Sequence, residues 1–365
     1  MSYSSGSGPS SISSSSDVAL NNPANGQTLS YNGTTQKWQN ATPVAVGGST
    51  NPFVVTPGST STDIGALINS AFATYDCVAV AAGSWSLTTT ILIDTGQTLM
   101  GFGWGASRIT AKSGLGANPM IAMANGSSAN FTICDLEING ASIATYGFYG
   151  YATDAPSGAD VSPDFTPIFE NFSIYGATVD GFYIGGSYSG GLRESRILNC
   201  KSKHNGQYGF NVSSSDCFMA NCTSHGNGSS AGGYLINGGN VKLMQCKAYY
   251  ENIGFNLTSE RVVLTGCEAQ DCLSYGIQSY GSNKIDAEVD TCGDASTAAV
   301  YINGSGCTLT LHCVTRTAPR GNTPTYALRL SSNSNIVVGL MNIGGYPNAY
   351  ANANRPATGS NFWIG

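Results

Sequence analysis

VKLMQCKAYYENIGFNL, at residues 241–257, is followed by a second version of the same pattern, VVLTGCEAQDCLSYGIQS, at residues 262–279. Each copy starts with apolar residues in alternate positions, continues to a cysteine, and ends with an apolar tetrad led by glycine. The cysteine recurs at intervals of 22, 24, 21 and 25 residues, at Cys200, Cys222, Cys246, Cys267 and Cys292. A repeat period in this range indicates a solenoid in which each turn is one supersecondary unit.

One turn of this solenoid is predicted to contain three short strands. Positions −5, −3, 0 and +2, counted from the cysteine, tend to be small or apolar. Alternation within each pair indicates a strand, and the change of phase between −3 and 0 indicates a tight bend. Position −1 is mostly asparagine or glycine, which tolerate the left-handed backbone that such a bend needs: Asn171, Asn199, Asn221, Gln245 and Gly266. The glycine-led tetrad is the third strand.

The third strands are expected to start at residues 181, 209, 233, 254, 276, 299 and 327. Parallel crossovers are right-handed as a rule, so the fold class is all-β, a right-handed parallel β-helix of about 11 coils. The repeat is interrupted at residues 111–166 and 307–325, where the register is left open.

The composition limits what the protein can bind. Only 10% of residues are charged and the net charge is −6, which gives no support for nucleic-acid binding or for an anionic membrane surface. No run of 18 apolar residues occurs, and the N-terminus lacks a secretion pattern. The 11 cysteines are expected to be reduced and to point inward. Neither their spacing nor the three histidines predicts a metal site, and we expect no cofactor.

The segments outside the repeat predict the domain organisation. Residues 1–16 form a flexible segment rich in Ser and Gly, residues 17–45 a small module of short strands, and residues 46–60 a linker. Residues 61–345 comprise a capping helix and the β-helix, and residues 346–365 close the C-terminal end. The helix is expected after Asp63, with one apolar face formed by Ile64, Leu67, Ile68, Ala71 and Phe72.

Two segments resemble known families. Residues 17–40, with Asn25-Gly26 and Asn32-Gly33, resemble a small module found near the ends of many bacteriophage tail-fibre and tail-tip proteins. Residues 61–103, ending in Leu99-Met100-Gly101-Phe102-Gly103, resemble the beginning of the pectate-lyase-like superfamily, which includes phage tailspikes and polysaccharide depolymerases. The resemblance implies attachment to other phage tail proteins through the N-terminus, and a virion protein of the tail tip or fibre made in the host bacterial cytoplasm.

The same resemblance implies that an active groove would lie on the outer face of the third strands. The outward positions there include a substrate-binding column for sugars: Tyr183, Asn211, Asn256, Gln278, Tyr301 and Arg329. Amides and tyrosines suit sugar hydroxyls and sugar faces, although an ordinary solvated sheet face would contain similar residue types. The column contains no carboxylate, so the chain departs from the pattern of a calcium-dependent lyase.

The corner before the third strand supplies a second set of candidates. His204 and His225 are predicted to bind substrate there, and Glu251 and Asp271 to act as a catalytic pair about one coil spacing apart, as in a retaining glycosidase. The alternative is that these polar residues satisfy backbone groups in turns. Glu288 and Asp290 are a further same-face carboxylate pair.

The outward positions −4 and −2, on the strand before the cysteine, form an apolar strip that includes Leu198, Phe218, Ala220, Met244 and Val263. Such a strip marks an interface, and tailspike-like coils pack side by side, so we expect a homotrimer. The function that fits best is a phage receptor-binding protein that presents a glycan-binding coil to host cell-surface polysaccharide. A tailspike depolymerase, and a structural tail component or surface adhesin, remain the alternatives.

Overall fold

The computed structural model describes residues 18–19, 28–32, 35–41, 52–125, 130–152, 166–186, 192–228, 230–294, 296, 298–314, 325–331, 335–342 and 348–352. The chain divides into two compact units, Met1–Asn51 and Pro52–Gly365. In the first unit, β1 (Val18–Ala19), β2 (Thr28–Asn32) and β3 (Lys37–Ala41) form a sheet of order β1-β3-β2. β2 and β3 are antiparallel, as the short-strand prediction requires.

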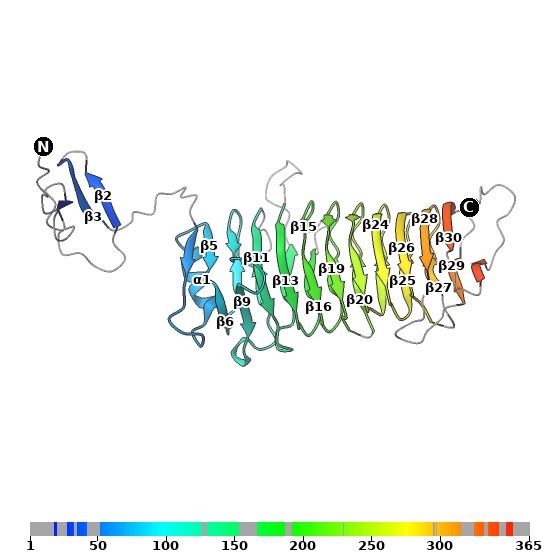
Figure 1. Ribbon diagram of the computed structural model, residues 1–365, viewed down its shortest axis with the longest axis horizontal. Helices are drawn as coiled ribbons and strands as arrows, with labels where there is room; N and C mark the ends of the chain where they lie inside the picture. The colour runs from blue at the N-terminus through cyan, green and yellow to red at the C-terminus, as the bar shows by residue number, and fades with distance from the viewer. Residues whose placement is uncertain are drawn as a thin grey trace, which may run out of the picture. The chain divides into compact units, whose positions relative to one another are not determined.

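The second unit is a long coil whose third strands form one parallel sheet of 11 strands (Figure 1). The successive strands are β7 (Ile91–Ile93), β10 (Ile121–Met123), β12 (Phe148–Ala152), β14 (Phe182–Gly186), β17 (Phe210–Val212), β20 (Gly232–Ile236), β23 (Ile253–Leu257), β25 (Tyr275–Ser279), β27 (Ala298–Ile302), β29 (Tyr326–Leu330) and β31 (Asn348–Asn352). The glycine-led tetrads therefore lie at this sheet, as predicted. β31 falls within the predicted closing segment and extends the sheet beyond residue 345.

The strands around each cysteine form the other walls. Separate first and second strands are β15 (Arg196–Leu198) with β16 (Lys201–Lys203), β18 (Phe218–Ala220) with β19 (Thr223–His225), and β21 (Lys242–Met244) with β22 (Lys247–Tyr249). In other turns one strand runs through the bend: β11 (Thr132–Asn139), β13 (Ile168–Tyr175), β24 (Val263–Gln270), β26 (Lys284–Asp290), β28 (Thr308–Val314) and β30 (Ile336–Asn342). The first turns contain β4 (Phe53–Val55), β5 (Cys77–Val80), β6 (Gly83–Leu87), β8 (Thr98–Met100) and β9 (Ser107–Ala111), followed by a 3-10 turn at Ser113–Leu115.

The predicted bends have the predicted backbone. At position −1 the φ angle lies between 48° and 58° in Asn171, Asn199, Asn221, Gln245 and Gly266. A second left-handed position closes the second strand, at Gly176, His204, Gly226, Tyr250 and Asp271. Asparagine and glycine carry little penalty in this conformation, so the local sequence sets the first corner. The second corner also holds His204, Tyr250 and Asp271, so residue type alone does not set it.

The interior is filled by stacked thiols and apolar groups. Cys200, Cys222, Cys246 and Cys267 are all buried and reduced, and each is in side-chain contact with its neighbour in the stack. Cys292 is also reduced and buried, as predicted, but it does not continue this stack beyond Cys267. Between Thr265 and Cys267 the register shifts, because β26 has no residue equivalent to Gly266, and Ala287 takes the place beside Cys267.

The helix α1 (Ile64–Phe72) forms where predicted, after the N-cap Asp63. It packs against β4, β5, β6 and β7, and its buried residues join the core of the coil. Leu67, expected on the buried face, is instead 36% exposed, since it lies at the edge of that face. β4 pairs with β5, so the predicted linker already contains the first strand of the coil. Among the described residues, no helix is long and apolar enough to cross a membrane.

Candidate functional site

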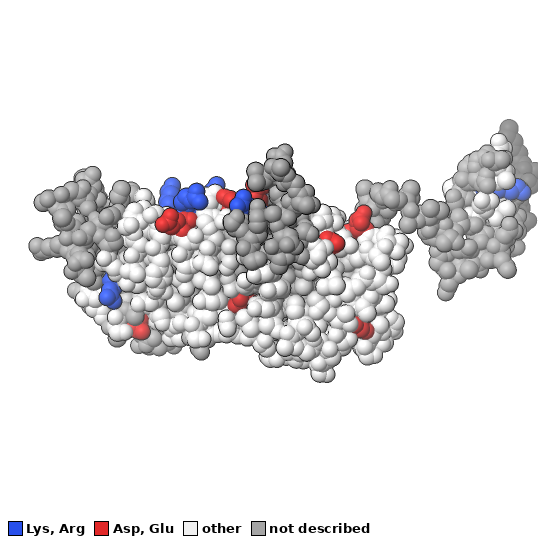
Figure 2. All heavy atoms as spheres, turned by 180° about the vertical axis from the view of Figure 1, so that it is seen from behind, with Lys and Arg blue, Asp and Glu red and all other residues white. Residues whose placement is uncertain are grey.

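The strand register brings the predicted substrate-binding column together on the third-strand sheet. Tyr183 is paired with Asn211, Asn256 with Gln278, and Tyr301 with Arg329. Leu235 lies between Asn211 and Asn256, so the column is interrupted by one apolar side chain. In the view of Figure 2, most of the visible Lys and Arg side chains of the coil lie along its upper edge, whereas Asp and Glu side chains are scattered.

Four tyrosines cluster at one end of this column, on β12, β14 and the corner before β12. The rings of Tyr149 and Tyr183 are stacked with centroids 5.1 Å apart, and those of Tyr149 and Tyr151 lie 5.9 Å apart. Tyr146 packs against both Tyr149, at 4.9 Å, and Tyr183, at 5.6 Å. We call these four residues the tyrosine cluster. It offers ring faces and hydroxyls at half-buried positions, which suits a ligand with both apolar and polar surfaces.

A buried carboxylate supports the edge of the tyrosine cluster. Asp180 accepts hydrogen bonds from the backbone N–H of Tyr208 and from Nδ2 of Asn211, both at 2.9 Å. Burial raises the pKa of Asp180 above its ordinary value, and these two hydrogen bonds oppose the increase. Asn211, predicted to bind substrate, therefore uses one side-chain donor to hold Asp180.

The other end of the column has its own polar and aromatic contacts. The rings of Tyr275 and Tyr301 are stacked at 5.5 Å, and the guanidinium of Arg329 lies 5.4 Å from the centre of the Tyr301 ring. Nε2 of Gln278 donates to the hydroxyl of Tyr280 at 2.6 Å, and Tyr280 is 43% exposed. Three of the predicted binding residues, Gln278, Tyr301 and Arg329, thus belong to a second cluster on the same sheet.

The predicted histidines also lie together, with ring centroids 5.1 Å apart, but they flank the second strand rather than the third-strand sheet. His225 pairs in register with Lys203 and Tyr249. His204 occupies the left-handed corner position that follows β16. The two histidines are therefore separated in the fold from the tyrosine column.

The predicted catalytic pair is buried. Glu251 is 0% exposed, and its carboxylate accepts hydrogen bonds from Oγ of Ser224 at 2.8 Å and from the backbone N–H and Nδ2 of Asn227, both at 2.9 Å. Asn227 in turn accepts from the backbone N–H and Nδ2 of Asn205. Glu251 ends a buried ladder of polar side chains inside the corner. This buried position favours the alternative that Glu251 hydrogen-bonds polar groups of the turn, and it disfavours contact between Glu251 and a polysaccharide.

Asp271 does not share that ladder. Cys272 occupies the equivalent inward position, where its backbone N–H donates to Sγ of Cys292 at 3.3 Å. Asp271 sits at the preceding left-handed position, is 5% exposed, and accepts from Nε2 of Gln270 at 3.2 Å. The two predicted catalytic carboxylates are therefore at different positions in their turns.

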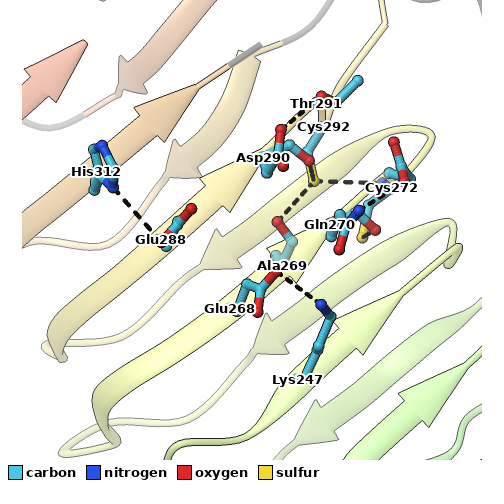
Figure 3. Close-up of polar contacts among 11 residues, drawn as sticks. Lys247, Glu268, Ala269, Gln270, Cys272, Glu288, Asp290, Thr291, Cys292 and His312 are labelled. Carbon is cyan, nitrogen blue, oxygen red and sulfur yellow. Dashed lines mark hydrogen bonds and ion pairs between the residues drawn. The ribbon is translucent and has the colours of Figure 1, made fainter. Parts of the chain in front are cut away.

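A groove of about 390 Å³ opens on the outer side of β24, β26 and β28, with Glu268, Asp286, Glu288 and His312 in its lining. Oε2 of Glu288 lies 3.6 Å from Nδ1 of His312, and Nζ of Lys247 lies 2.9 Å from Oε1 of Glu268. Figure 3 shows these ion pairs between neighbouring strands. Of the Glu288–Asp290 pair, only Glu288 lines the groove.

Tyr146, Tyr149 and Tyr151 lie in a stretch where the repeat is interrupted, so the repeat count did not place them beside Tyr183. The available signal was the alternation of Tyr149 and Tyr151 on one strand, in register with β14. Glu268, Asp286 and His312 were not predicted as a group, because their proximity depends on the register of three strands. Within the described ranges, no group of three or more His, Cys, Asp or Glu is placed to hold a metal ion.

Comparison with known proteins confirms the architecture. Residues 157–315 match the family model described as a right handed beta helix region. A search of curated protein sequences gave no match. The right-handed parallel β-helix predicted from the repeat is thus supported by the sequence family as well as by the coordinates.

Solved structures share this fold at low identity. ORF18 of Geobacillus virus E2 is 16% identical, with a TM-score of 0.57, over 86% of this chain and 68% of that protein. Tailspike protein 2 of the Escherichia coli O157:H7 bacteriophage CAB120 is 14% identical, with a TM-score of 0.61, over 79% of this chain and 42% of the tailspike. The catalytic domain of a GH87 alpha-1,3-glucanase, solved with tetrasaccharides, is 17% identical, with a TM-score of 0.51, over 82% and 59%. The chain spans less than two thirds of the tailspike and the glucanase domain, and the likeness shows a common fold.

Proposed function

We propose that this protein is a phage tail receptor-binding protein that binds host cell-surface polysaccharide on its third-strand sheet. The observation that carries the proposal is the tyrosine cluster, which brings together three rings of the third-strand sheet and a fourth from the corner before β12. Sugar rings have apolar C–H faces and a rim of hydroxyls, and tyrosines meet both with little loss of conformational entropy. The β-helix shared with a phage tailspike makes a tail location the natural setting.

The test is the binding of purified protein to capsule or wall polysaccharide from candidate hosts, measured by surface plasmon resonance. Tyr149→Ala removes a ring that contacts the three others of the cluster, and we expect the affinity to fall at least about tenfold. Val54→Ala, at a 46% exposed position on β4 and outside this sheet, is the control. If Tyr149→Ala binds as the wild type does, the cluster is not the binding site.

A depolymerase is the second candidate, and the groove lined by Glu268, Asp286, Glu288 and His312 favours it. Carboxylates on one strand two residues apart, and on neighbouring strands, have spacings suited to general acid and base roles. New reducing ends or unsaturated uronates from host polysaccharide would support this activity. Glu288→Gln is then expected to abolish it, whereas Asp290→Asn, outside the groove, is expected to retain it.

The homotrimer and the tail attachment remain part of the proposal. The predicted apolar strip is exposed at Met244, 41%, but it is not continuous, because Arg196, Lys242 and Lys284 share a column with Phe218 and Val263. Mixed apolar and cationic surface is compatible with a non-obligate interface. The N-terminal unit would attach the coil to other tail proteins.

A further inference from the structure

The outer face of the second strands carries aromatic rings and cations on successive turns. Nζ of Lys201 lies 4.4 Å from the centre of the Trp104 ring, and Nζ of Lys203 lies 5.0 Å from that of Tyr175. The next turns add His225 and Tyr249, whose rings are stacked at 5.1 Å. We call these six residues the aromatic–cationic stripe. It lies on a different strand column from the tyrosine cluster.

The charges along this face are not balanced. At one end Arg108 is paired with Glu137 at 2.5 Å, and at the other Lys247 is paired with Glu268 at 2.9 Å. Lys201 and Lys203 have no ion-pair partner among the residues that the structure describes. Two unneutralised ammonium groups on one strand, in a chain with a net charge of −6, make a local site of positive potential.

The rings beneath these ammonium groups remain accessible. Trp104 is 38% exposed although its Nε1–H donates to the carbonyl of Asn171, so its indole is held in place with part of its surface free. Its neighbour Phe102 is 58% exposed. A fixed ring beside a lysine ammonium group is a surface on which a ligand can displace the lysine, stack on the ring, and pair its anion with the ammonium group.

We propose that the aromatic–cationic stripe binds an acidic polysaccharide, one whose sugar rings carry carboxylates. Trp104 and Tyr175 would take the sugar faces, and Lys201 and Lys203 the carboxylates. The inference rests on the proposed role in glycan recognition, but it assigns the acidic substrate class and a second face of the coil.

The experiment measures binding of the full chain to polygalacturonate, alginate, hyaluronan and polysialate, with dextran as the neutral polymer and poly(glycerol phosphate) as an anion without sugar rings. We expect at least one carboxylate polymer to bind, with an affinity that falls as salt is raised from 50 to about 500 mM, since exposed charges are then screened. Dextran and poly(glycerol phosphate) are expected not to bind at this site. Failure of all four carboxylate polymers, or equal binding of poly(glycerol phosphate), would overturn the proposal.

Variants locate the site. Lys201→Ala with Lys203→Ala is expected to weaken binding about tenfold or more and to flatten the salt dependence. Lys112→Ala with Lys37→Ala removes the same charge from exposed positions outside the stripe and should stay within about twofold of wild type. If both double variants weaken binding equally, the loss comes from the change in net charge, and the stripe is not a binding site.

Trp104 gives a direct readout that folding defects do not mimic. Stacking of a sugar should change its fluorescence, and Trp104→Phe should abolish that change while retaining part of the affinity. The tyrosine cluster variant Tyr149→Ala separates the two proposals. If Tyr149→Ala loses binding to host polysaccharide but keeps the Trp104 fluorescence response to the carboxylate polymer, the two sites are independent. If the carboxylate polymers give no Trp104 response while Tyr149→Ala still weakens binding to host polysaccharide, the stripe proposal fails and the tyrosine cluster proposal is retained.

Discussion

At the scale of single residues, Glu251 shows how the coil uses buried polar groups. Its two carboxylate oxygens accept three hydrogen bonds from Ser224 and Asn227, and no water is needed to satisfy them. The leading glycines make room for this ladder, because a Cβ at Gly209 would come within 2.2 Å of Oγ of Ser224. The need to hydrogen-bond buried polar groups inside this corner therefore explains both the glycine at position 209 and the acidic residue at position 251.

Glu251→Gln is expected to destabilise the protein by about 1–3 kcal/mol, because its amide NH₂ faces donors that need an acceptor. Denaturant unfolding followed by circular dichroism measures the loss. Glu260→Gln, at an exposed position, is the control and should be neutral. A stable Glu251→Gln protein that had lost polysaccharide cleavage would instead revive the catalytic prediction for Glu251.

The thiols should be unreactive in the folded protein. Burial raises the pKa of Cys217 and of Cys313 to about 12, so neither forms the reactive thiolate near neutral pH. Of the 11 cysteines only Cys77 and Cys134 are not fully buried, and burial raises the pKa of Cys134 to about 12. Ellman's reagent at pH 8 should label Cys77 first and all 11 only after denaturation. Rapid native labelling of Cys246, found by mass spectrometry, would contradict the stacked interior.

At the scale of elements, α1 depends on one side chain. Oδ1 of Asp63 accepts from the backbone N–H of Gly65 in the helix and from those of Thr88 and Thr89 beyond β6. Asp63 thus caps the helix and attaches it to the first turns of the coil. Burial alone would raise the pKa of Asp63, but these hydrogen bonds outweigh it and lower the pKa below the ordinary 3.8.

Asp63→Ala is expected to cost about 1–2 kcal/mol near pH 7. Since the folded pKa is depressed, the stability that the carboxylate supplies is present above pH 3.8 and is lost as the pH falls through the lower folded value. The difference between wild type and Asp63→Asn should therefore shrink on acidification below pH 4. Asp76→Asn, at an exposed position, is the control variant. A difference in unfolding free energy between wild type and Asp63→Asn that is constant from pH 7 to pH 3 would contradict this role of the Asp63 carboxylate.

At the scale of the whole molecule, the coil is a series of similar turns that contact mainly their neighbours. Its faces differ because each strand column repeats its own residue types: amides and tyrosines on the third strands, cations and rings on the second, and a mixed strip on the first. Long parallel coils can therefore present several binding surfaces without a deep pocket.

If the mixed strip forms a homotrimer interface, Met244→Lys should release monomers, because it adds a charge beside Lys242 at the centre of the strip. Analytical ultracentrifugation gives the mass of each species. Leu92→Lys, an equally exposed apolar position on the third-strand sheet, should leave the oligomer intact. A wild-type monomer at micromolar concentration would exclude the trimer.

Much of the fold was predictable because the information is local. Alternation with a period of two marks the strands, and asparagine or glycine at position −1 marks a left-handed corner, so three strands per turn could be counted from the sequence alone. The column Tyr183, Asn211, Asn256, Gln278, Tyr301 and Arg329 followed from the same count.

Tertiary structure decided what local patterns cannot. Whether Glu251 faces inward or outward depends on which residue takes the left-handed position before it, and Tyr250 takes it. The place of Cys292 depends on a register shift at Gly266, which only pairing with β26 reveals. The tyrosine cluster and the aromatic–cationic stripe join residues from different turns. Their proximity is set by strand register across the coil, because hydrogen bonding between turns, rather than any sequence motif, fixes which side chains become neighbours.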